Sequence, residues 1–247
     1  MSDEAVWVMF GLAAVTFLGV SFVVAPYGRH AREGFGPTMP ARWGWVLMES
    51  PAVFALLFFF FTGPAPMQPA ALALLGVWLL HYLHRTFVFP FRMRADGKTM
   101  PVFIAALAIG FNLFNAYLNG RWLSAEGRYP ASWLMDARFL GGTALFLAGF
   151  GLNLWADGVL RRLRAPGETG YRVPSGGLYE YVSCPNYLGE LLEWAGFALA
   201  AWSLAGLAFF AYTVANLAPR ARAHHRWYHE KFPDYPRSRK ALVPFLW

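Results

Sequence analysis

One acidic side chain lies where lipid is expected and could therefore do chemistry. Glu49 stands in the segment Trp45-Val-Leu-Met-Glu49-Ser-Pro51, inside a long apolar run. A carboxyl in such a run is costly unless it is neutral, paired or hydrated. A neutral Glu49 can donate a proton, which makes it a candidate acid. The alternative is an acid at a helix end near the membrane interface, which the nearby Pro51 favours.

A cluster of polar residues, His81-Tyr82-Leu83-His84-Arg85, stands at the end of another apolar run. Helical spacing places His81 and Arg85 on one face, with Tyr82 beside Arg85. Anchoring at the membrane interface accounts for Arg85 and one histidine. It does not require all four polar residues of this cluster, which are His81, Tyr82, His84 and Arg85. The phenol of Tyr82 can polarise a carbonyl by donating a hydrogen bond, so we predict a catalytic role for Tyr82.

Three further stripes of polar side chains have helical spacing. They consist of Asn153 and Asp157, whose face continues to Arg161 and Arg164; of Asn186, Glu190 and Glu193; and of Arg220, His224, Tyr228 and Lys231. Such stripes suit a polar or anionic ligand that enters a helix bundle. The last stripe has an alternative interpretation, a basic amphipathic helix on the inner leaflet of the membrane.

Several familiar kinds of site are not supported by the sequence. The six histidines lack zinc-type spacing and Cys184 is the single cysteine, so we predict no metal site. Gly149-Phe-Gly151 lies within an apolar helix and lacks the third glycine of a Rossmann fingerprint, so any dinucleotide binds by another route. No nucleic-acid-binding pattern accompanies the net charge of +7, and we expect no nucleic acid partner.

Membrane helices have to position these side chains. Of the 247 residues 57% are hydrophobic, and the mean hydropathy is +0.36, too apolar for an ordinary soluble domain. Seven apolar runs cover residues 5–26, 43–63, 69–89, 101–119, 139–160, 188–202 and 203–218, of which the last two are together short for two full spans. We therefore predict an all-α integral membrane protein with seven transmembrane helices in a single domain, 1–247. The last two runs abut, and a shorter re-entrant pair is the alternative.

The basic residues predict the orientation of this bundle. The loops after the first, third and fifth runs and the tail, counted together with Arg85 near the end of the third run, hold 18 of the 21 lysines and arginines. By the positive-inside rule the N-terminus is then outside and the C-terminus cytoplasmic, which requires an odd number of spans. The same distribution attracts anionic membrane lipids, which accounts for the net charge without a further ligand.

Several motifs occur together in a recognisable order. They are Leu160-Arg-Arg-Leu-Arg164-Ala-Pro-Gly-Glu168-Thr-Gly-Tyr171-Arg172, Tyr181-Val-Ser-Cys-Pro-Asn186-Tyr-Leu-Gly-Glu190-Leu-Leu-Glu193-Trp194, His224-His225-Arg226-Trp227-Tyr228, the end of the chain from Asp234 to Trp247, and His81-Tyr82-Leu-His84-Arg85. From Trp45 to Trp247 the chain resembles the steroid 5α-reductase family, and the abundance of arginine, alanine and glycine suggests a bacterial member.

The resemblance implies an NADPH-dependent membrane enzyme that reduces the Δ4 double bond of 3-oxo-Δ4 steroids to 5α-3-oxosteroids. Glu49 and Tyr82 match the residues that hydrogen-bond the 3-keto oxygen, and Trp45 matches a wall of the steroid pocket. The cofactor-binding set corresponds to Asn153, Asp157, Arg164, Tyr171, Arg172, Asn186, Glu190, Arg220, His224 and Tyr228. The substrate pocket then falls mainly in residues 1–119 and the cofactor site mainly in residues 139–247. One departure concerns Met48, where the animal enzymes commonly have glutamine.

The residue types suit this chemistry. Hydride addition to the β-carbon of an enone builds negative charge on the carbonyl oxygen, which proton donors stabilise. Guanidinium groups such as those of Arg164, Arg172 and Arg220 bind phosphates well. The resemblance also implies a steroid that arrives from the lipid phase, no obligate protein partner, and a location in the bacterial inner membrane or, in a eukaryote, the endoplasmic reticulum.

Three alternatives stay open at this point. Met48 motivates a reductase of another conjugated carbonyl, such as an enoyl thioester or a polyprenal. The basic and aromatic motifs near the C-terminus also resemble membrane methyltransferases of the isoprenylcysteine type, which use S-adenosylmethionine. A non-catalytic sterol-binding protein is the third alternative, against which the concentration of polar groups at one end of the bundle argues.

Overall fold

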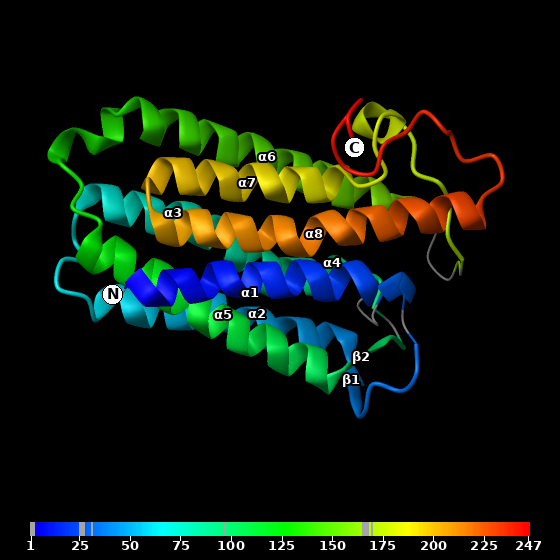
Figure 1. Ribbon diagram of the computed structural model, residues 1–247, viewed down its shortest axis with the longest axis horizontal. Coiled ribbons are helices and arrows are strands. Elements are labelled where there is room, and N and C mark those ends of the chain that lie inside the picture. Colours follow the sequence, from blue (N-terminus) through cyan, green and yellow to red (C-terminus); the bar gives the residue numbers. More distant parts are fainter. Residues whose placement is uncertain (1–2, 25–27, 31, 96, 165–167, 169) are drawn as a thin grey trace.

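The computed structural model describes residues 3–24, 28–30, 32–95, 97–164, 168 and 170–247. Its α-helices are α1 (Asp3–Phe22), α2 (Ala41–Phe61), α3 (Pro69–Leu83), α4 (Phe89–Arg92), α5 (Val102–Arg121), α6 (Ala137–Arg162), α7 (Pro185–Ala201) and α8 (Leu204–Lys231). Short 3₁₀ or π segments are η1 (Gly28–His30), η2 (His84–Val88), η3 (Trp122–Glu126), η4 (Ala131–Met135) and η5 (Gly177–Glu180). The long helices lie side by side along the longest axis of the molecule (Figure 1).

Five helical stretches among the described residues are long and apolar enough to cross a membrane. They are Glu4–Phe22, Ala41–Phe61, Pro69–Arg92, Val102–Ala125 and Ala137–Arg162. The prediction of a largely helical membrane protein is thus confirmed. The stretch from Pro69 extends past the predicted end at Phe89, because η2 and α4 continue α3 to Arg92. The predicted end of the first run at Pro26 lies outside the described residues.

The two remaining predicted spans form a tight helical pair. Helix α7 has 17 residues, and α8 is one continuous helix of 28 residues that passes through Pro219 to Lys231. Trp202 ends α7 with a left-handed backbone (φ 45°), and the Ser203 hydroxyl caps α8 by accepting from the Gly206 amide. Whether both helices fully cross the bilayer, as the seven-span arrangement requires, stays a prediction, as does the orientation.

A small antiparallel sheet departs from the all-helical expectation. Strand β1 (Thr38–Pro40) pairs with β2 (Thr99–Pro101), with Met39 opposite Met100. Both strands have prolines at their ends and only three residues, so alternation of apolar and polar residues could not reveal them. The sheet joins the loop before α2 to the loop before α5 at one end of the bundle (Figure 1).

Close backbone contact joins α6 to α7. A Cβ at Gly149 would stand 2.5 Å from the Glu193 nitrogen, and a Cβ at Gly196 would stand 2.4 Å from the Phe146 nitrogen. Gly142 and Gly189 meet the facing backbone in the same way. Seven residues separate the glycines on each helix, so they lie on one face and let the helices touch. This contact fixes how the polar residues of α6 face those of α7.

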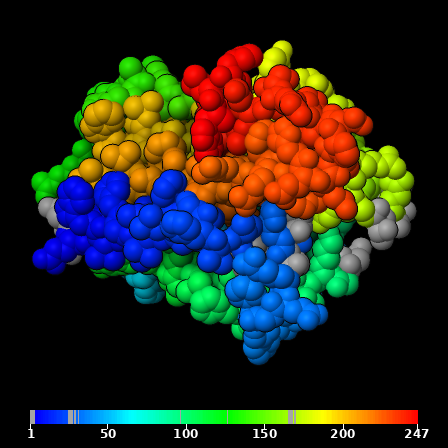
Figure 2. All heavy atoms as spheres, turned by 45° about the vertical axis from the view of Figure 1, so that its right-hand side comes forward, coloured from blue at the N-terminus to red at the C-terminus, as the bar shows by residue number. Residues whose placement is uncertain are grey.

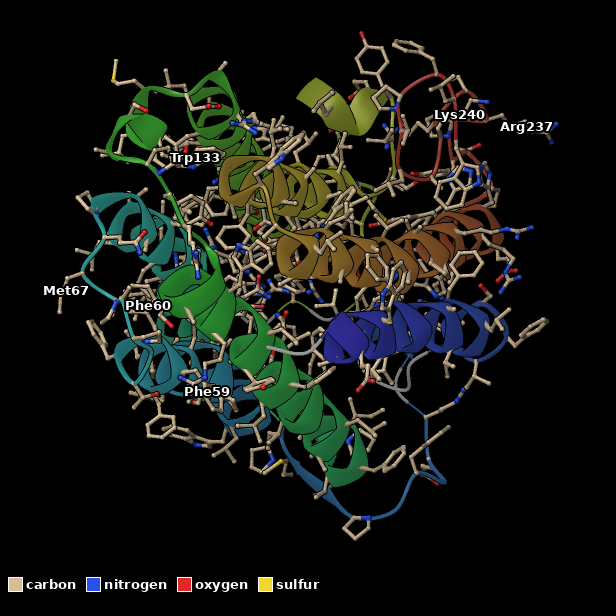
Figure 3. The ribbon with its side chains drawn as sticks, turned by 60° about the vertical axis from the view of Figure 1, so that its left-hand side comes forward. Phe59, Phe60, Met67, Trp133, Arg237 and Lys240 are labelled. Carbon is tan, nitrogen blue, oxygen red and sulfur yellow. The ribbon has the colours of Figure 1, made fainter. Side chains whose placement is uncertain are left out.

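The opposite ends of the bundle differ in charge. Trp133, Met67 and Phe60 lie at one end, and the basic Arg237 and Lys240 lie at the other (Figure 3). The C-terminal tail packs back onto the basic end, where the Arg239 guanidinium donates to the Pro174 carbonyl (2.8 Å) and the Ser183 amide donates to the Lys240 carbonyl (2.8 Å). Helix α1 lies across the face of the molecule next to α8 (Figure 2).

Candidate active site

A central cavity of about 350 Å³ lies between the helices. We call it the central cavity throughout. Its wall is mostly apolar and comes from α1, α2, α3, η2, α5, α7 and α8. The polar side chains on this wall include those of Glu49, His81, Tyr82, Arg85, Asn112, Glu190 and Arg220. Four of these residues were predicted as site residues from the sequence, although they are far apart in the chain: Glu49, Tyr82, Glu190 and Arg220.

Glu49 reaches the central cavity from α2, where two polar side chains bond to the backbone around it. The Asn112 amide of α5 donates to the Met48 carbonyl (2.7 Å) and to Glu49 Oε2 (3.3 Å). The Ser50 hydroxyl donates to the Val46 carbonyl (2.5 Å). Glu49 therefore lies in the interior of the protein, and the alternative of an acid at a helix end is wrong for this structure, in which α2 continues to Phe61.

Tyr82 is 4% exposed and lies in an aromatic cluster on the same cavity wall. Its ring packs against Trp78 and Trp194, with centroids 5.0 and 5.4 Å apart. The neighbouring His81 Nδ1 lies 2.5 Å from Glu193 Oε2, which ties α3 to α7 through two buried groups. The phenol of Tyr82 is thus held by neighbours of fixed orientation, as a group that must aim a proton requires.

Arg85 occupies the region between Trp45 and the acidic residues of α6 and α7. Its guanidinium lies 4.7 Å from the Trp45 ring centroid and 4.5 Å from that of Phe89. It also forms long ion pairs with Asp157 (3.9 Å) and Glu190 (3.8 Å). The sequence offered interfacial anchoring as an account of Arg85, whereas the structure places it inside the bundle, where it compensates two carboxylates.

A second cavity, of about 400 Å³, lies at the basic end of the bundle, and we call it the basic cavity. Trp45 lines both cavities, which therefore adjoin. Five cationic residues line the basic cavity: Arg92, Arg94, Lys98, Arg161 and Arg164. The Arg94 guanidinium also donates to the Arg164 carbonyl, which joins the loop after α4 to the end of α6. Such a concentration of cations suits a polyanion.

Lys98 shows the electrostatic strain within the basic cavity. Its partial burial, with the nearby charges of Arg164 and Arg94, lowers the pKa of its amine below the ordinary lysine value. A bound anion would relieve this repulsion. From the sequence alone, Arg92, Arg94 and Lys98 count only toward the basic loop after the third apolar run, and Arg161 only continues the stripe of Asn153 and Asp157. A loop that holds three cations within seven residues was the available signal.

Asn153, Asp157 and Asn186 meet where α6 packs on α7. The Asn153 amide donates to the Asn186 carbonyl (2.9 Å), and the Asn186 amide donates to Asp157 Oδ1 (3.1 Å). Asp157 also lines the basic cavity. The two stripes predicted from i, i+4 spacing therefore face each other, next to Arg85 and Glu190.

Three predicted residues lie beyond the end of α6. The Arg164 guanidinium donates to the Gly170 carbonyl (2.9 Å) and lies 5.3 Å from the centroid of the Tyr171 ring. Arg172 pairs with Glu168 at 2.8 Å in an exposed position. Of these three residues, only Arg164 lines either cavity. Roles of Tyr171 and Arg172 in binding a cofactor stay predictions.

The predicted stripe on α8 divides along its length. Arg220 lines the central cavity and lies 5.7 Å from the Tyr187 ring. His224 Nε2 lies 3.0 Å from the Tyr187 hydroxyl, and its Nδ1 lies 3.1 Å from His30 Nε2. Tyr228 is 2% exposed and stacks on Tyr235 with centroids 5.0 Å apart, away from the wall of either cavity. Its role in cofactor binding stays a prediction.

This arrangement can bind two different molecules next to each other. The central cavity offers apolar walls with two proton-bearing side chains, Glu49 and Tyr82, and the basic cavity offers cations. An apolar carbonyl compound fits the first description, and a phosphate-bearing cofactor fits the second. The two molecules would meet near Trp45 and Arg85.

Comparisons with known proteins point in one direction. Residues 98–247 match the model of the family described as 3-oxo-5-alpha-steroid 4-dehydrogenase. The chain is 45% identical to the 3-oxo-5-alpha-steroid 4-dehydrogenase 1 of Bos taurus over 99% of its length and 96% of the bovine protein. It is 44% identical to the steroid 5-alpha-reductase DET2 of Gossypium hirsutum over 97% of the chain and 95% of the plant protein. It is 45% identical to the human 3-oxo-5-alpha-steroid 4-dehydrogenase 1 over 89% of the chain and 85% of the human protein.

Proposed function

Because the chain belongs to the steroid 5α-reductase family, a family of oxidoreductases acting on CH–CH bonds, we propose that it reduces the Δ4 double bond of 3-oxo-Δ4 steroids with NADPH. One observation carries the finer part of this proposal. Glu49 and Tyr82 share an apolar cavity whose neighbour is lined by five cationic residues. The relatives' names favour this reaction over methyl transfer.

The central cavity suits a steroid with a single polar end. Apolar and aromatic side chains of α1, α5 and α8, among them Ile104, Phe111 and Phe209, offer walls for fused rings. Glu49 and Tyr82 would then bind the carbonyl group of the steroid. A carboxylic acid and a phenol that both donate to the 3-keto oxygen stabilise the negative charge that develops there during reduction. Where a bound steroid displaces water from the cavity, these hydrogen bonds are stronger than they would be in solution.

The basic cavity suits the phosphates of NADPH. The phosphates would be held by the five cationic residues of this cavity, Arg92, Arg94, Lys98, Arg161 and Arg164. Partial burial and the charges of Arg164 and Arg94 lower the pKa of Lys98, and a bound polyanion would relieve this repulsion. When bound, NADPH supplies the hydride that C5 of the steroid accepts. Asp157 lines the basic cavity, and together with Asn186, which donates to it, and Asn153, which donates to the Asn186 carbonyl, it would orient the cofactor's uncharged polar groups.

Arg85 has a separate task in this proposal. Asp157 and Glu190 stand close to the path between the cavities, and two uncompensated carboxylates would repel an anionic cofactor. Arg85 pairs with both and stacks between Trp45 and Phe89. Its single positive charge thereby offsets part of the negative charge of the two carboxylates at the junction of the two cavities.

The decisive experiment is single-turnover oxidation of NADPH by detergent-purified protein with progesterone or testosterone. Mass spectrometry against standards identifies the stereochemistry of the product at C5. A 5α product supports the proposal. Bound NADPH without turnover would redirect the search to other enones, and binding of S-adenosylmethionine without binding of NADPH would support the methyltransferase alternative.

Variants test the division of labour between the cavities. Tyr82→Phe and Glu49→Gln should lower turnover while NADPH affinity stays near that of the wild type. Arg172→Ala and Asn186→Ala should weaken NADPH binding. Equal loss of cofactor binding in both pairs would contradict the assignment of Glu49 and Tyr82 to the steroid.

A second substrate class is favoured by one observation. Met48 lines the central cavity next to Glu49, and its thioether has no hydrogen to donate to a carbonyl. A conjugated carbonyl other than a 3-oxo steroid, such as an enoyl thioester or a polyprenal, could then be the preferred substrate. Relative kcat/KM values over a panel of these compounds and steroids would decide between the two classes.

A further inference from the structure

Asn112 is one of three buried carboxamides of α5, together with Asn115 and Asn119. Its side chain is 5% exposed and lines the central cavity. A carboxamide within a membrane helix costs free energy unless its polar atoms find partners. The neighbouring residues of α5 on the same wall, Ala108 and Phe111, are apolar. Asn112 is not among the site residues predicted from the sequence, so its place in the site comes from the structure.

The amide group of Asn112 makes two contacts to α2. Its Nδ2 lies 2.7 Å from the Met48 carbonyl oxygen and 3.3 Å from Glu49 Oε2. A backbone carbonyl only accepts, so the short contact to Met48 requires the nitrogen of the amide at this place. The nitrogen carries two hydrogens, one for each acceptor. Asn112 therefore connects the Glu49 carboxyl to the backbone of the residue before it.

This connection determines the roles of the two carboxyl oxygens of Glu49. Oε2 accepts a hydrogen bond from Asn112, and the carbonyl oxygen of a neutral carboxyl is a better acceptor than its hydroxyl oxygen, so this bond favours Oε2 as the unprotonated oxygen. A neutral Glu49 then carries its proton on Oε1. The same hydrogen bond limits rotation of the carboxyl group. One oxygen is thus an acceptor toward α5, and the other is available to donate.

The segment of α2 that carries Glu49 also needs support from outside its own helix. Pro51 has no N–H, so the Leu47 carbonyl lacks its usual helical partner. Ser50 bonds the Val46 carbonyl from within α2, and Asn112 bonds the Met48 carbonyl from α5. A glutamine before Glu49, as in the animal enzymes, would have brought an amide into the site, whereas Met48 packs its thioether near Met100 and Ala105.

We propose that Asn112 is a positioning residue for Glu49, which holds Oε2 as an acceptor and leaves Oε1 to donate the proton that polarises the substrate's carbonyl oxygen. This inference rests on the proposed function, since it assumes a carbonyl in the central cavity. It adds a residue from α5 to a reaction that otherwise uses α2 and α3. It also gives this chain a donor next to the site carboxyl in place of one at position 48.

The test compares Asn112→Leu, which keeps the volume and removes the donor, with the wild type in NADPH oxidation with progesterone. We expect kcat to fall about tenfold, the loss that one hydrogen bond of ordinary strength implies, with KM for NADPH unchanged. Asn115→Leu is the matched control, because it removes a buried carboxamide of α5 that lines neither cavity. It should keep kcat, whatever its effect on stability.

Two further measurements separate positioning from a structural role. The carbonyl stretching frequency of progesterone bound with NADP⁺, read by isotope-edited infrared spectroscopy, should move back toward its solution value in Asn112→Leu and in Glu49→Gln, but not in Asn115→Leu. Adding Met48→Gln to Asn112→Leu should restore part of kcat, because it returns an amide to the neighbourhood of Glu49.

The outcomes distinguish this inference from the proposal on which it rests. A wild-type kcat and a wild-type carbonyl frequency in Asn112→Leu would overturn the inference while leaving the reductase assignment intact. An equal fall of kcat in Asn115→Leu would also overturn it, because the loss would then reflect the stability of α5. A wild-type protein that binds NADPH but reduces no oxosteroid would overturn the proposed function and this inference with it.

Discussion

Replacing Gly149 by alanine should separate α6 from α7 and weaken cofactor binding. The new Cβ would stand 2.5 Å from both the Glu193 nitrogen and the Gly189 oxygen, whereas ordinary contact begins near 3.4 Å. Both atoms belong to the backbone, so α7 has to move by about 0.9 Å, the difference between these distances. Overpacking of this kind costs about 1–3 kcal/mol.

The same displacement reaches the polar contact one turn further along α6. The hydrogen bond from the Asn153 amide to the Asn186 carbonyl is 2.9 Å long, and a shift of about 0.9 Å would carry it beyond hydrogen-bonding distance. Loss of one or two such bonds costs about 1–2 kcal/mol. We therefore expect the Kd for NADPH to rise roughly tenfold.

The assay is NADPH binding by fluorescence titration in detergent, together with thermal unfolding of the same samples. Gly151→Ala is the control, because a Cβ at Gly151 meets no atom within 4 Å on the same helix. That control gains helix propensity, about 1 kcal/mol, without a clash. If Gly149→Ala binds NADPH and unfolds like Gly151→Ala, the argument from backbone contact is wrong.

Three other perturbations test separate parts of the structure. Because the pKa of Lys98 is lowered and a polyanion favours its charged form, NADPH affinity should decline as pH rises through that lowered pKa, and Lys98→Arg should remove the decline in a titration series. Hydrogen bonds from Arg138 lower the pKa of Asp136 from its ordinary value of 3.8 to about 2. The ionised Asp136 therefore stabilises the folded protein above about pH 4, and this stabilisation is lost as pH falls toward 2. Thermal unfolding of Asp136→Asn should not show this loss. Trp78→Phe removes the donor to the Ala52 carbonyl (2.8 Å) in a fully buried position and should destabilise the protein by about 1–3 kcal/mol in denaturant titrations.

The sequence was most informative where polar residues interrupt apolar runs. Glu49 stands out because a carboxyl in lipid is costly, and Tyr82 because it belongs to a cluster of polar residues at the end of an apolar run; the structure places both on one cavity. The i, i+4 spacing of Asn153 and Asp157 predicts a common face, but not that Asn186 lies opposite. That pairing depends on the rotation of α6 against α7, which the packing of their glycines sets.

The remaining features depend on contacts between distant segments. The residues that line the basic cavity from the loop after α4 were interpreted as topology, because a charge count does not reveal which loops meet. Gly149 was considered only as part of a failed nucleotide fingerprint, although its role is in helix packing. Tyr228 shares a helical face with Arg220, but spacing cannot show that α8 has passed both cavities by that point.

The position of the central cavity has a kinetic consequence. Its wall includes Thr16, Gly19 and Val20 of α1, a helix that is mostly exposed along its apolar length. A steroid that reaches this cavity from the lipid is supplied from a two-dimensional solvent, whereas NADPH is supplied from water. The concentration that governs steroid binding is then a mole fraction in the bilayer or micelle. At fixed total steroid, adding lipid or detergent should raise the apparent KM for steroid by surface dilution and leave that for NADPH unchanged.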